Sequence, residues 1–508
     1  MRRVPAILVA MTLLSACAGL PPLEGRAPSV ALADTADTRL GRLLAAPVAA
    51  HPGKTGIYAL GVPGDAFAAR VLLAGAADRS LDVQYYIWHD DQTGRLMAEA
   101  LWRAAERGVR VRLLLDDNGI AGLDAMLAAL DAHPNIEVRL YNPFVQRSAR
   151  ALGYLTDFGR LNRRMHNKSM TADNRMSIVG GRNIGNEYFG AGGEMVFEDL
   201  DVIAVGAAVR EVSEAFDLYW NSDSAYPLAA LVPPAGAGAA ARLEALFAEA
   251  RADPRAVSYL RALRETRLAR ELLGGGLPIE WADARVVRDD PAKTLDTSGR
   301  TDVLLLAQLL RTTTPAEKSF DLISPYFVPG EEGTAALVAL AQRGVTVRVL
   351  TNSYAATDVG AVHAGYARRR EALLRAGVRL YELKPSAASD EAKAKPGHSS
   401  ASLHAKTSAT DGARLFVGSF NFDQRSALLN TEMGLLIDSP ALAQRLARAL
   451  DERLPRAAYE VRLAEGGGLE WIDRAGGSPA RLTAEPGTGP LRRAWIGLLS
   501  LLPIEWLL

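Results

Sequence analysis

A short polar pattern that occurs twice constrains the fold of this chain more than any other feature. Residues 166–173 and 404–411 both read His-x-Lys, then four residues, then Asp. Side chains alternate between the two faces of an extended strand, so the His and the Lys of each copy project to the same side. The second Asp is followed by Gly412, and Asp-Gly is typical of a tight hairpin. The pattern predicts two equivalent units of strand and turn.

The similarity between the two stretches continues beyond the turn. Counted from each His, a glycine stands at +14, an asparagine at +17 and a Glu-Met pair at +28 and +29. These residues are Gly180, Asn183, Glu194 and Met195 in the first copy and Gly418, Asn421, Glu432 and Met433 in the second. Equal spacing at so many positions indicates an internal duplication, in which each copy brings one His and one Lys.

The segments before each motif predict parallel strands covered by helices. In the first copy, strands are expected at residues 81–88, 109–115 and 136–141, with helices at 95–107 and 123–132 between them. The same order returns from residue 320, with a drift of only four residues between the copies. We therefore predict an α/β fold of two duplicated domains, each a mixed sheet flanked by helices. The domains should pack about a pseudo-two-fold axis with both motifs at the seam.

The predicted organisation has six parts. They are a signal peptide at 1–16, a linker at 17–54, a first domain at 55–224, a helical connector at 225–301, a second domain at 302–460 and a C-terminal segment with an apolar tail at 461–508. The connector begins with a stretch rich in Pro, Ala and Gly, and three consecutive glycines end its helical part.

The residues of the two motifs suit displacement at a phosphodiester. One imidazole attacks phosphorus and forms a phosphohistidine; the other protonates the leaving alkoxide and then deprotonates the incoming water or alcohol. Positive charge and amide donors stabilise the non-bridging oxygens. The candidates are His166 and His404 for the imidazoles, with Lys168, Lys406, Asn183 and Asn421 around the phosphate. No metal or other cofactor is expected, because the lysines already neutralise the phosphate.

Carboxylates complete the predicted site. An acid behind each imidazole fixes its tautomer and stabilises its cation, and Glu194 and Glu432 are the candidates. Asp173 and Asp411 belong to the motif and are counted with its catalytic residues. Their place at a turn nevertheless favours a structural role for both.

Both motifs resemble the signature of the phospholipase D superfamily, in particular its bacterial cardiolipin synthase branch. Residues 418–426, Gly-Ser-Phe-Asn-Phe-Asp-Gln-Arg-Ser, are similar to the Gly-Ser-x-Asn segment of that superfamily, which makes Ser419 a candidate phosphate ligand. The first copy has Gly181 at this place, so it lacks the hydroxyl and the halves are unequal. The resemblance implies that His166 is the nucleophile and His404 the acid and base. The residues themselves do not order them.

Two other groups of polar residues permit more than one interpretation. Asp199 and Asp201 fall in a strand expected at 197–205, and a solvated strand face explains them better than contact with the site. His363 and Tyr366 lie in an insertion of the second copy, and loops after sheet strands often line clefts. They are candidates for head-group contacts or ordinary residues of a helix start, and the sequence leaves both open.

The N-terminus has the pattern of a bacterial lipoprotein signal. Arg2 and Arg3 precede a mostly apolar stretch at 4–14, and Leu-Ser-Ala-Cys follows at 14–17. Cys17 is the only cysteine and the expected site of lipidation. The expected location is a periplasm-facing membrane of the cell envelope, with the inner and the outer membrane both open.

The last 18 residues are markedly apolar. They are too few and too interrupted to span a bilayer, which takes about 20 apolar residues. Two tryptophans and two arginines suit a segment at the membrane interface, and packing onto the rest of the protein is the alternative.

The balance of charge bears on the partner. Lys and Arg total 58, as do Asp and Glu; without residues 1–16, which hold two arginines and no acid, the totals are 56 and 58. Proteins that bind polynucleotides usually have a basic excess. Nucleic acid is therefore not expected as a partner.

The resemblance implies a membrane-tethered phosphatidyltransferase that forms cardiolipin through a phosphatidyl-histidine. Its substrates would be phosphatidylglycerol with a second phosphatidylglycerol or with phosphatidylethanolamine. Three alternatives stay open: a phospholipase D hydrolase that releases phosphatidic acid, a nuclease of the superfamily, and a non-catalytic lipid-binding or scaffold protein. The completeness of both motifs favours an enzyme over the last of these.

Overall fold

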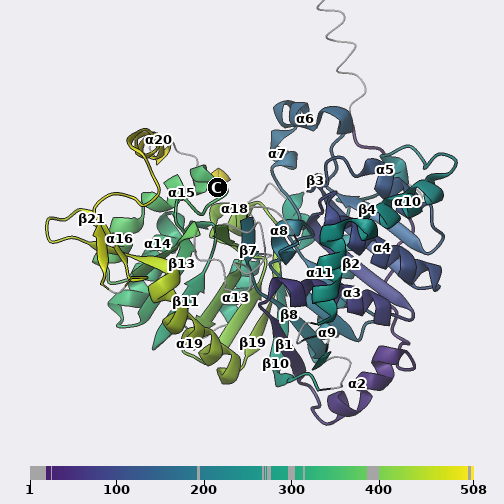
Figure 1. The fold of residues 1–508 in the computed structure, drawn as a ribbon, viewed down its shortest axis with the longest axis horizontal. Helices are drawn as coiled ribbons and strands as arrows, with labels where there is room; N and C mark the ends of the chain where they lie inside the picture. Colours follow the sequence, from purple (N-terminus) through teal and green to yellow (C-terminus); the bar gives the residue numbers. More distant parts are fainter. Residues whose placement is uncertain are drawn as a thin grey trace, which may run out of the picture.

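Two α/β halves lie side by side and share one sheet, which has 18 strands in the part of the chain that the structure describes (Figure 1). The structure is a computed structural model that describes residues 19–23, 26–191, 195–265, 268, 270–271, 276–295, 304–312, 315–385, 400–476, 478–500 and 505–508. The predicted signal peptide, Cys17 and Glu194 lie outside these residues. The predicted fold class, two duplicated α/β domains, is confirmed.

In the first half, three neighbouring parallel strands are followed by antiparallel strands that lead to the seam, and one short antiparallel strand lies at the outer edge. The hydrogen-bonded order is β9-β4-β3-β2-β5-β6-β8-β1, with β2, β3 and β4 parallel. The bounds are β1 Thr55–Leu60, β2 Ser80–Ile87, β3 Arg110–Gly119, β4 Ile136–Tyr141, β5 Ser169–Ala172, β6 Met176–Gly180, β8 Asp201–Gly206 and β9 Ala225–Pro227. The three parallel strands are those that the sequence predicts.

The second half repeats this order from the seam outward. The sequence of neighbours is β10-β19-β17-β16-β11-β13-β14-β20-β21-β22, with β11, β13 and β14 parallel. The bounds are β10 Glu280–Arg288, β11 Ser319–Ile323, β13 Thr346–Asn352, β14 Arg379–Leu383, β16 Lys406–Thr410, β17 Arg414–Gly418, β19 Met433–Asp438, β20 Ala458–Leu463, β21 Leu469–Asp473 and β22 Ala480–Leu482. β21 and β22 extend this half beyond anything in the first.

The halves are joined where β1 pairs antiparallel with β10. β10 lies in the region predicted as a helical connector, which also contains α10 (Ala239–Ala252) and α11 (Pro254–Arg264). β10 pairs with β19 as β1 pairs with β8, so it is the counterpart of β1. The second copy therefore begins near residue 280, not 302. β10 shows no regular alternation of buried and exposed residues, which is why its sequence gives little sign of a strand.

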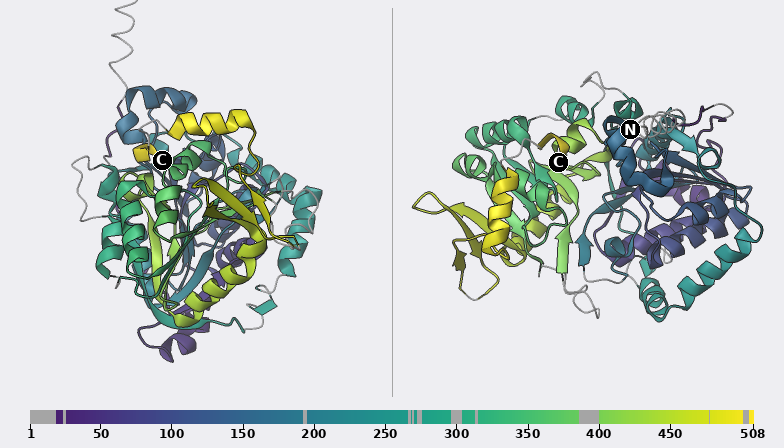
Figure 2. Two further views of the ribbon diagram at one scale, coloured as in Figure 1. Left: turned by 90° about the vertical axis from the view of Figure 1, so that its left-hand side faces the viewer. Right: turned by 90° about the horizontal axis from the view of Figure 1, so that it is seen from above.

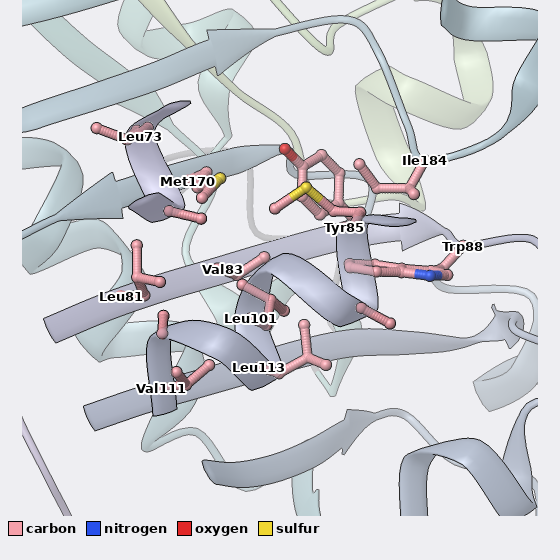
Figure 3. Close-up of a cluster of buried hydrophobic side chains, with 14 of the residues drawn as sticks. Leu73, Leu81, Val83, Tyr85, Trp88, Leu101, Val111, Leu113, Met170 and Ile184 are labelled. Carbon is pink, nitrogen blue, oxygen red and sulfur yellow. The ribbon is translucent and has the colours of Figure 1, made fainter. Parts of the chain in front are cut away.

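Helices cover both faces of the first half. α3 (Pro63–Ala76) and α4 (Gln92–Glu106) pack on one face, where Leu73 and Leu101 belong to the same buried cluster as Val83 of β2 and Leu113 of β3 (Figure 3). On the other face, α9 (Ala207–Trp220) covers Leu114. Strands buried on both sides are apolar at consecutive positions, as in residues 113–115, and they form a rigid base for the loops at their ends.

Two pairs of short elements stand at one end of the molecule, the top of Figure 1. α6 (Arg150–Thr156) and α7 (Phe158–Leu161) lie between β4 and the first motif, and α20 (Pro490–Ser500) and η5 (Glu505–Leu507) end the chain. Figure 2 shows α20 and α6 at the same end in a second view. In the described residues, none of the helices is both long and apolar enough to cross a bilayer.

The stretch before β1, which we expected to act as a spacer, is packed on the first half. Arg26 donates to the carbonyl oxygens of Asn221 (2.9 Å) and Ala225 (3.0 Å). α2 (Arg39–Ala49) follows, capped by the hydroxyl of Thr38.

Candidate active site

Each His-x-Lys segment is held by the half to which it does not belong. The backbone N–H of His166 donates to the carbonyl of Thr431 (2.9 Å), and that of His404 donates to the carbonyl of Glu198 (2.8 Å). In the second case, β15 (Ser400–Leu403), just before the motif, pairs in parallel with β7 (Met195–Glu198). The two motifs therefore meet at the seam, as the sequence predicts.

The carboxylates that support the imidazoles are crossed in the same way. His166 Nδ1 lies 2.9 Å from Glu432 Oε2, and His404 Nδ1 lies 2.6 Å from Asp199 Oδ2. Both carboxylates and both imidazoles are buried. Because each Nδ1 is bound by a carboxylate, Nε2 is the ring nitrogen left for chemistry.

The expectation that Asp199 lies on a solvated strand face is wrong. Its pairing partner is His404, and it is only 6% exposed. The neighbouring Asp201 is fully buried too, between the guanidinium groups of Arg70 and Arg182. The closing strand expected at 197–205 is in fact two strands, β7 and β8, and the break between them turns Asp199 toward the seam.

Asp199, not Glu194, is the counterpart of Glu432. Gly180 pairs with Asp201 in the first half, and Gly418 pairs with Gly434 in the second, so Asp199 and Glu432 both lie two residues before the paired position. Gly180 precedes Asp201 by 21 residues, whereas Gly418 precedes Gly434 by 16. Between this glycine and the carboxylate, the distance in sequence from each His is therefore no longer the same in the two copies.

The difference between Gly181 and Ser419 follows from the difference between the carboxylates. The Ser419 hydroxyl donates to Glu432 and accepts the N–H of Met433 (3.0 Å). A Cβ on Gly181 would lie 2.2 Å from Asp199 Oδ1. The shorter acid thus occupies the room that a serine would need. Ser419, predicted as a phosphate ligand, contacts the Glu432 carboxylate instead.

Both motif lysines are buried beside their own histidines. Lys168 Nζ donates to the carbonyl oxygen of His166 (2.5 Å), and Lys406 Nζ lies 3.0 Å from His404 Nδ1. Burial lowers the pKa of Lys406 to about 8 and that of Lys168 well below its ordinary value. Ammonium groups with little solvation are strong donors to a phosphate.

The electrostatics show that the four motif groups share one site. Burial lowers the pKa of His166 well below its ordinary value, and the charges of Lys168, Lys406 and His404 lower it further. The pKa of His404 is also lowered by burial and by Lys406, while Asp199 raises it. Groups from both halves act on both rings, so the site is a joint product of the two copies.

The two carboxylates differ in charge as well as in length. Burial raises the pKa of Glu432 to about 7. Burial also favours the neutral form of Asp199, but His404, Lys406 and Arg182 outweigh it and hold the pKa of Asp199 below its ordinary value. At neutral pH His404 therefore faces an anion, whereas His166 faces an acid that is partly protonated.

The two asparagines predicted as phosphate ligands differ in their contacts. Asn183 accepts the N–H of Ile87 (3.1 Å) through its oxygen and donates to the hydroxyl of Tyr188 (3.0 Å). Asn421 is buried, and its side-chain oxygen has no hydrogen-bond partner within the described part of the chain. Asn183 thus supports the residues around the site through its bonds to Ile87 and Tyr188. The side-chain oxygen of Asn421 can still accept a hydrogen bond.

The motif aspartates lie at the turns and bind backbone. Asp173 and Asp411 have φ of 51° and 55°, which Asp tolerates better than most residues. Asp173 accepts the N–H of Ser80 (2.9 Å) and Asp411 that of Ser319 (2.9 Å), each at the start of the neighbouring strand. They fix the hairpins to the sheet, which is the structural role favoured above.

Sequence reasoning missed several residues that shape the site. The rings of Tyr86 and Tyr188 stand edge-on to His166 and His404, with centroids 5.0 and 5.1 Å apart. Asp116 accepts the N–H of Met165 (2.8 Å) and so fixes the backbone before His166. Asp116 follows a buried apolar run in a parallel strand, and this position near the end of the strand could have identified it as a site residue.

His363 and Tyr366 lie in a network that includes Arg370 and the C-terminal segment. His363 and Arg370 both bond to Glu485 of the C-terminal segment. Tyr366 packs under Arg370, whose guanidinium carbon is 4.6 Å from the ring centroid. These residues secure the C-terminal segment to the second half.

Two imidazoles, each paired with a carboxylate and flanked by a lysine, on a duplicated α/β fold define a protein of the phospholipase D superfamily. The family described as "Cardiolipin synthase, PLD-like domain" matches residues 72–220 and 309–454, and the chain belongs to this family.

Known proteins agree with this assignment. Cardiolipin synthase C of Escherichia coli K12 is 49% identical over 461 residues, which is 90% of this chain and 97% of that protein. An uncharacterised protein of Helicobacter pylori J99 is 31% identical over 84% of this chain and 85% of its own length. The crystal structure of phosphatidylserine synthase from Haemophilus influenzae has the same fold, with a TM-score of 0.54 and 15% identity over 93% of this chain and 100% of that one.

Proposed function

We propose that this protein is a phosphatidyltransferase that forms cardiolipin from two phospholipids through a phosphatidyl-histidine. The observation that carries the proposal is the pair of crossed imidazole–carboxylate contacts in one buried site. The similarity to cardiolipin synthase C along nearly the whole chain supports this product. The substrates are phosphatidylglycerol with a second phosphatidylglycerol or with phosphatidylethanolamine.

The electrostatics support different roles for the two histidines. Burial and the charges of Lys168 and Lys406 lower the pKa of His166, so its neutral form is favoured and its Nε2 lone pair attacks phosphorus. The ionised Asp199 stabilises the proton on His404, which suits a general acid. The P–O bond to the head group breaks, and the leaving alkoxide takes that proton.

The second step reverses the first with another alcohol. The hydroxyl of the acceptor phospholipid gives its proton to His404, its oxygen attacks phosphorus, and the P–N bond to His166 breaks. Lys168 and Lys406 stabilise the negative charge on the non-bridging oxygens in both steps.

A product assay tests the proposal. Vesicles that contain labelled phosphatidylglycerol, alone or with phosphatidylethanolamine, are incubated with purified protein, and the lipids are resolved by mass spectrometry. Cardiolipin is the expected product, together with glycerol or ethanolamine. Phosphatidic acid as the only product would mean that water is the acceptor and would contradict the transferase.

We also propose that the protein is held on a periplasm-facing membrane by a lipid on Cys17. The basic, apolar and Leu-Ser-Ala-Cys segments at its N-terminus support this location. Radiolabelled palmitate should label the wild type but not Cys17→Ser. Equal labelling of both forms would contradict the anchor.

A further inference from the structure

The α6–α7 segment exposes apolar side chains to an unusual degree. Leu155 is 82% exposed, Leu152 55% and Phe158 43%. A surface helix normally turns its leucines inward. In α6 the outward face is the apolar one.

The polar side chains of the same segment point toward the protein. Arg150 lies 3.2 Å from the buried carboxylate of Asp117, and Tyr154 donates to the side-chain oxygen of Asn118 (2.9 Å). These contacts fix α6 on the end of β3 with its leucines directed outward. The exposure is therefore built into the fold.

A chain of contacts connects α6 with the active site. Asn118, which accepts from Tyr154, donates to the hydroxyl of Tyr86 (3.1 Å). The ring of Tyr86 stands edge-on to His166. These contacts place α6, which carries the exposed leucines, close to the active site.

The C-terminal segment presents a second apolar group beside the first. Leu491 is 87% exposed, Leu498 53% and Trp506 52%, although Ile496 of the same helix is buried. The end of the chain is fixed by Arg425, which donates to the carbonyl oxygens of Leu507 (3.0 Å) and Leu508 (2.9 Å). This tail thus packs onto the protein and also exposes several apolar side chains.

The two groups adjoin across the seam. Arg425, which holds the C-terminus, also donates to the carbonyl oxygen of Asn162 (3.0 Å), the residue after α7. In Figure 1, α6 and α7 lie above one half and α20 above the other, with α18 (Gln424–Leu428) and β7 between them. The view from the side in Figure 2 places α6 and α20 at the same end.

Apolar exposure is concentrated at this end. Eight large apolar side chains are more than half exposed among the described residues, and five of them belong to α6, α20 or η5. They lie on separate elements of both halves. A flat apolar phase would contact all of them together, whereas a single partner helix needs a continuous groove. Leucine, phenylalanine and tryptophan are typical of segments at the bilayer interface.

We propose that α6–α7 and α20–η5 form a docking rim, defined by Leu152, Leu155, Phe158, Leu491, Leu498 and Trp506, that enters the surface of a phospholipid bilayer. The rim has parts on both sides of the seam that holds the histidines, so head groups would reach them without the lipid leaving the membrane. The inference deepens the proposed function, because it assigns the surface through which that substrate arrives.

A fluorescent label tests the contact without relying on activity. In full-length Cys17→Ser, which has no other cysteine, Leu155→Cys is labelled with an environment-sensitive dye; Leu43→Cys serves as the matched control. Leu43 is 58% exposed on α2, at the opposite end of the molecule. Phosphatidylglycerol vesicles should shift the emission of the first label to the blue and leave the second unchanged. Equal responses, or a shift caused by protein concentration without vesicles, would overturn the rim; the latter would indicate a second copy as the occupant.

An activity comparison separates the rim from the chemistry. The combined change of Leu152, Leu155 and Phe158 to Ser should lower turnover of vesicle lipid by roughly tenfold. Turnover of dihexanoyl-phosphatidylglycerol below its micelle concentration should stay the same. Equal loss on both substrates would overturn the rim. Absence of cardiolipin with wild-type protein, with the blue shift retained, would contradict the proposed function and leave the rim intact.

Discussion

The two halves of the molecule have the same strand order but provide their histidines with different surroundings. The first half supplies Asp199 with Gly181, and the second supplies Glu432 with Ser419. The shorter acid stays ionised beside His404, and the longer one has a pKa raised to about 7 beside His166. The backbone of the site is symmetric, whereas its proton chemistry is not. In the proposed mechanism, small changes at one pair of positions are enough to separate a nucleophile from an acid.

The strongest test of this asymmetry removes each imidazole in turn. His166→Ala should lower transfer by about 10⁴-fold or more, because no nucleophile remains. His404→Ala should also fail on natural lipids, since the alkoxide is not protonated. With phosphatidyl-p-nitrophenol, whose leaving group needs no acid, His404→Ala should still release one equivalent of nitrophenol and carry a phosphatidyl group detectable by intact-protein mass spectrometry. A burst from His166→Ala and none from His404→Ala would reverse the assignment.

The next test compares the carboxylates. Asp199→Asn should reduce kcat/KM by roughly 10²–10⁴-fold, because the charge that stabilises protonated His404 is lost. Glu432→Gln should cost about tenfold, since Glu432 is already partly neutral and Gln still accepts a hydrogen bond from Nδ1. Both variants are measured in the same vesicle assay. Equal losses would mean that the two acids have the same role.

A third test concerns packing around the acids. Gly181→Ser should lower the free energy of unfolding by about 1–3 kcal/mol, because its side chain meets Asp199. Adding Asp199→Glu reproduces the arrangement of the second half and should recover part of the loss. Ser419→Gly, the matched change on the other side, should cost only about 1 kcal/mol through a lost hydrogen bond. Chemical denaturation measures all four proteins; a double variant no more stable than Gly181→Ser would refute the coupling.

The last test concerns the pH dependence of stability. The folded pKa of Glu432, about 7, exceeds its ordinary 4.5, so the folded protein holds a proton that the unfolded chain releases between these values. Its contribution to stability is therefore lost as pH rises toward 7. Glu432→Gln should gain about 1–3 kcal/mol relative to wild type between pH 5 and 8.

Asp199→Asn is the control for this measurement. The pKa of Asp199 is lowered, so its stabilisation is present above the ordinary pKa and disappears only at more acidic pH. Asp199 itself should therefore add no pH dependence to the stability difference between this variant and wild type from pH 5 to 8; any change below about pH 6.5 comes from His404, whose pKa Asp199 raises. Parallel curves for both variants in thermal unfolding would show that the acids do not differ in protonation.

The sequence predicted the features that depend on local pattern. Apolar runs and turn residues located the parallel strands within a few residues, and the repeated motif placed His166 and His404 at one seam. The turn role of Asp173 and Asp411 followed from the conformations that Asp tolerates. In each case the cause lies within a few residues of the effect.

The features that were missed depend on distant partners. Asp199 looked like a solvated residue because its partner, His404, is 205 positions away. The five-residue difference in loop length between the copies then made Glu194 look equivalent to Glu432. β10 lacks regular alternation because it is a strand only through its pairing with β1 and β19. Tertiary pairing of this kind leaves no periodic trace in the sequence.

The crossed contacts have a consequence for how such a chain can be divided. A half produced on its own would carry an imidazole whose stabilising acid resides on the missing piece, so it could act only as a pair of identical copies. Two identical copies would surround their histidines identically. In this chain both copies belong to one polypeptide and are joined where β1 pairs with β10. A residue of one copy can therefore change without the same change in the other copy. Different surroundings for the two histidines are thus possible because both copies lie in one chain, whereas a symmetric dimer cannot provide them.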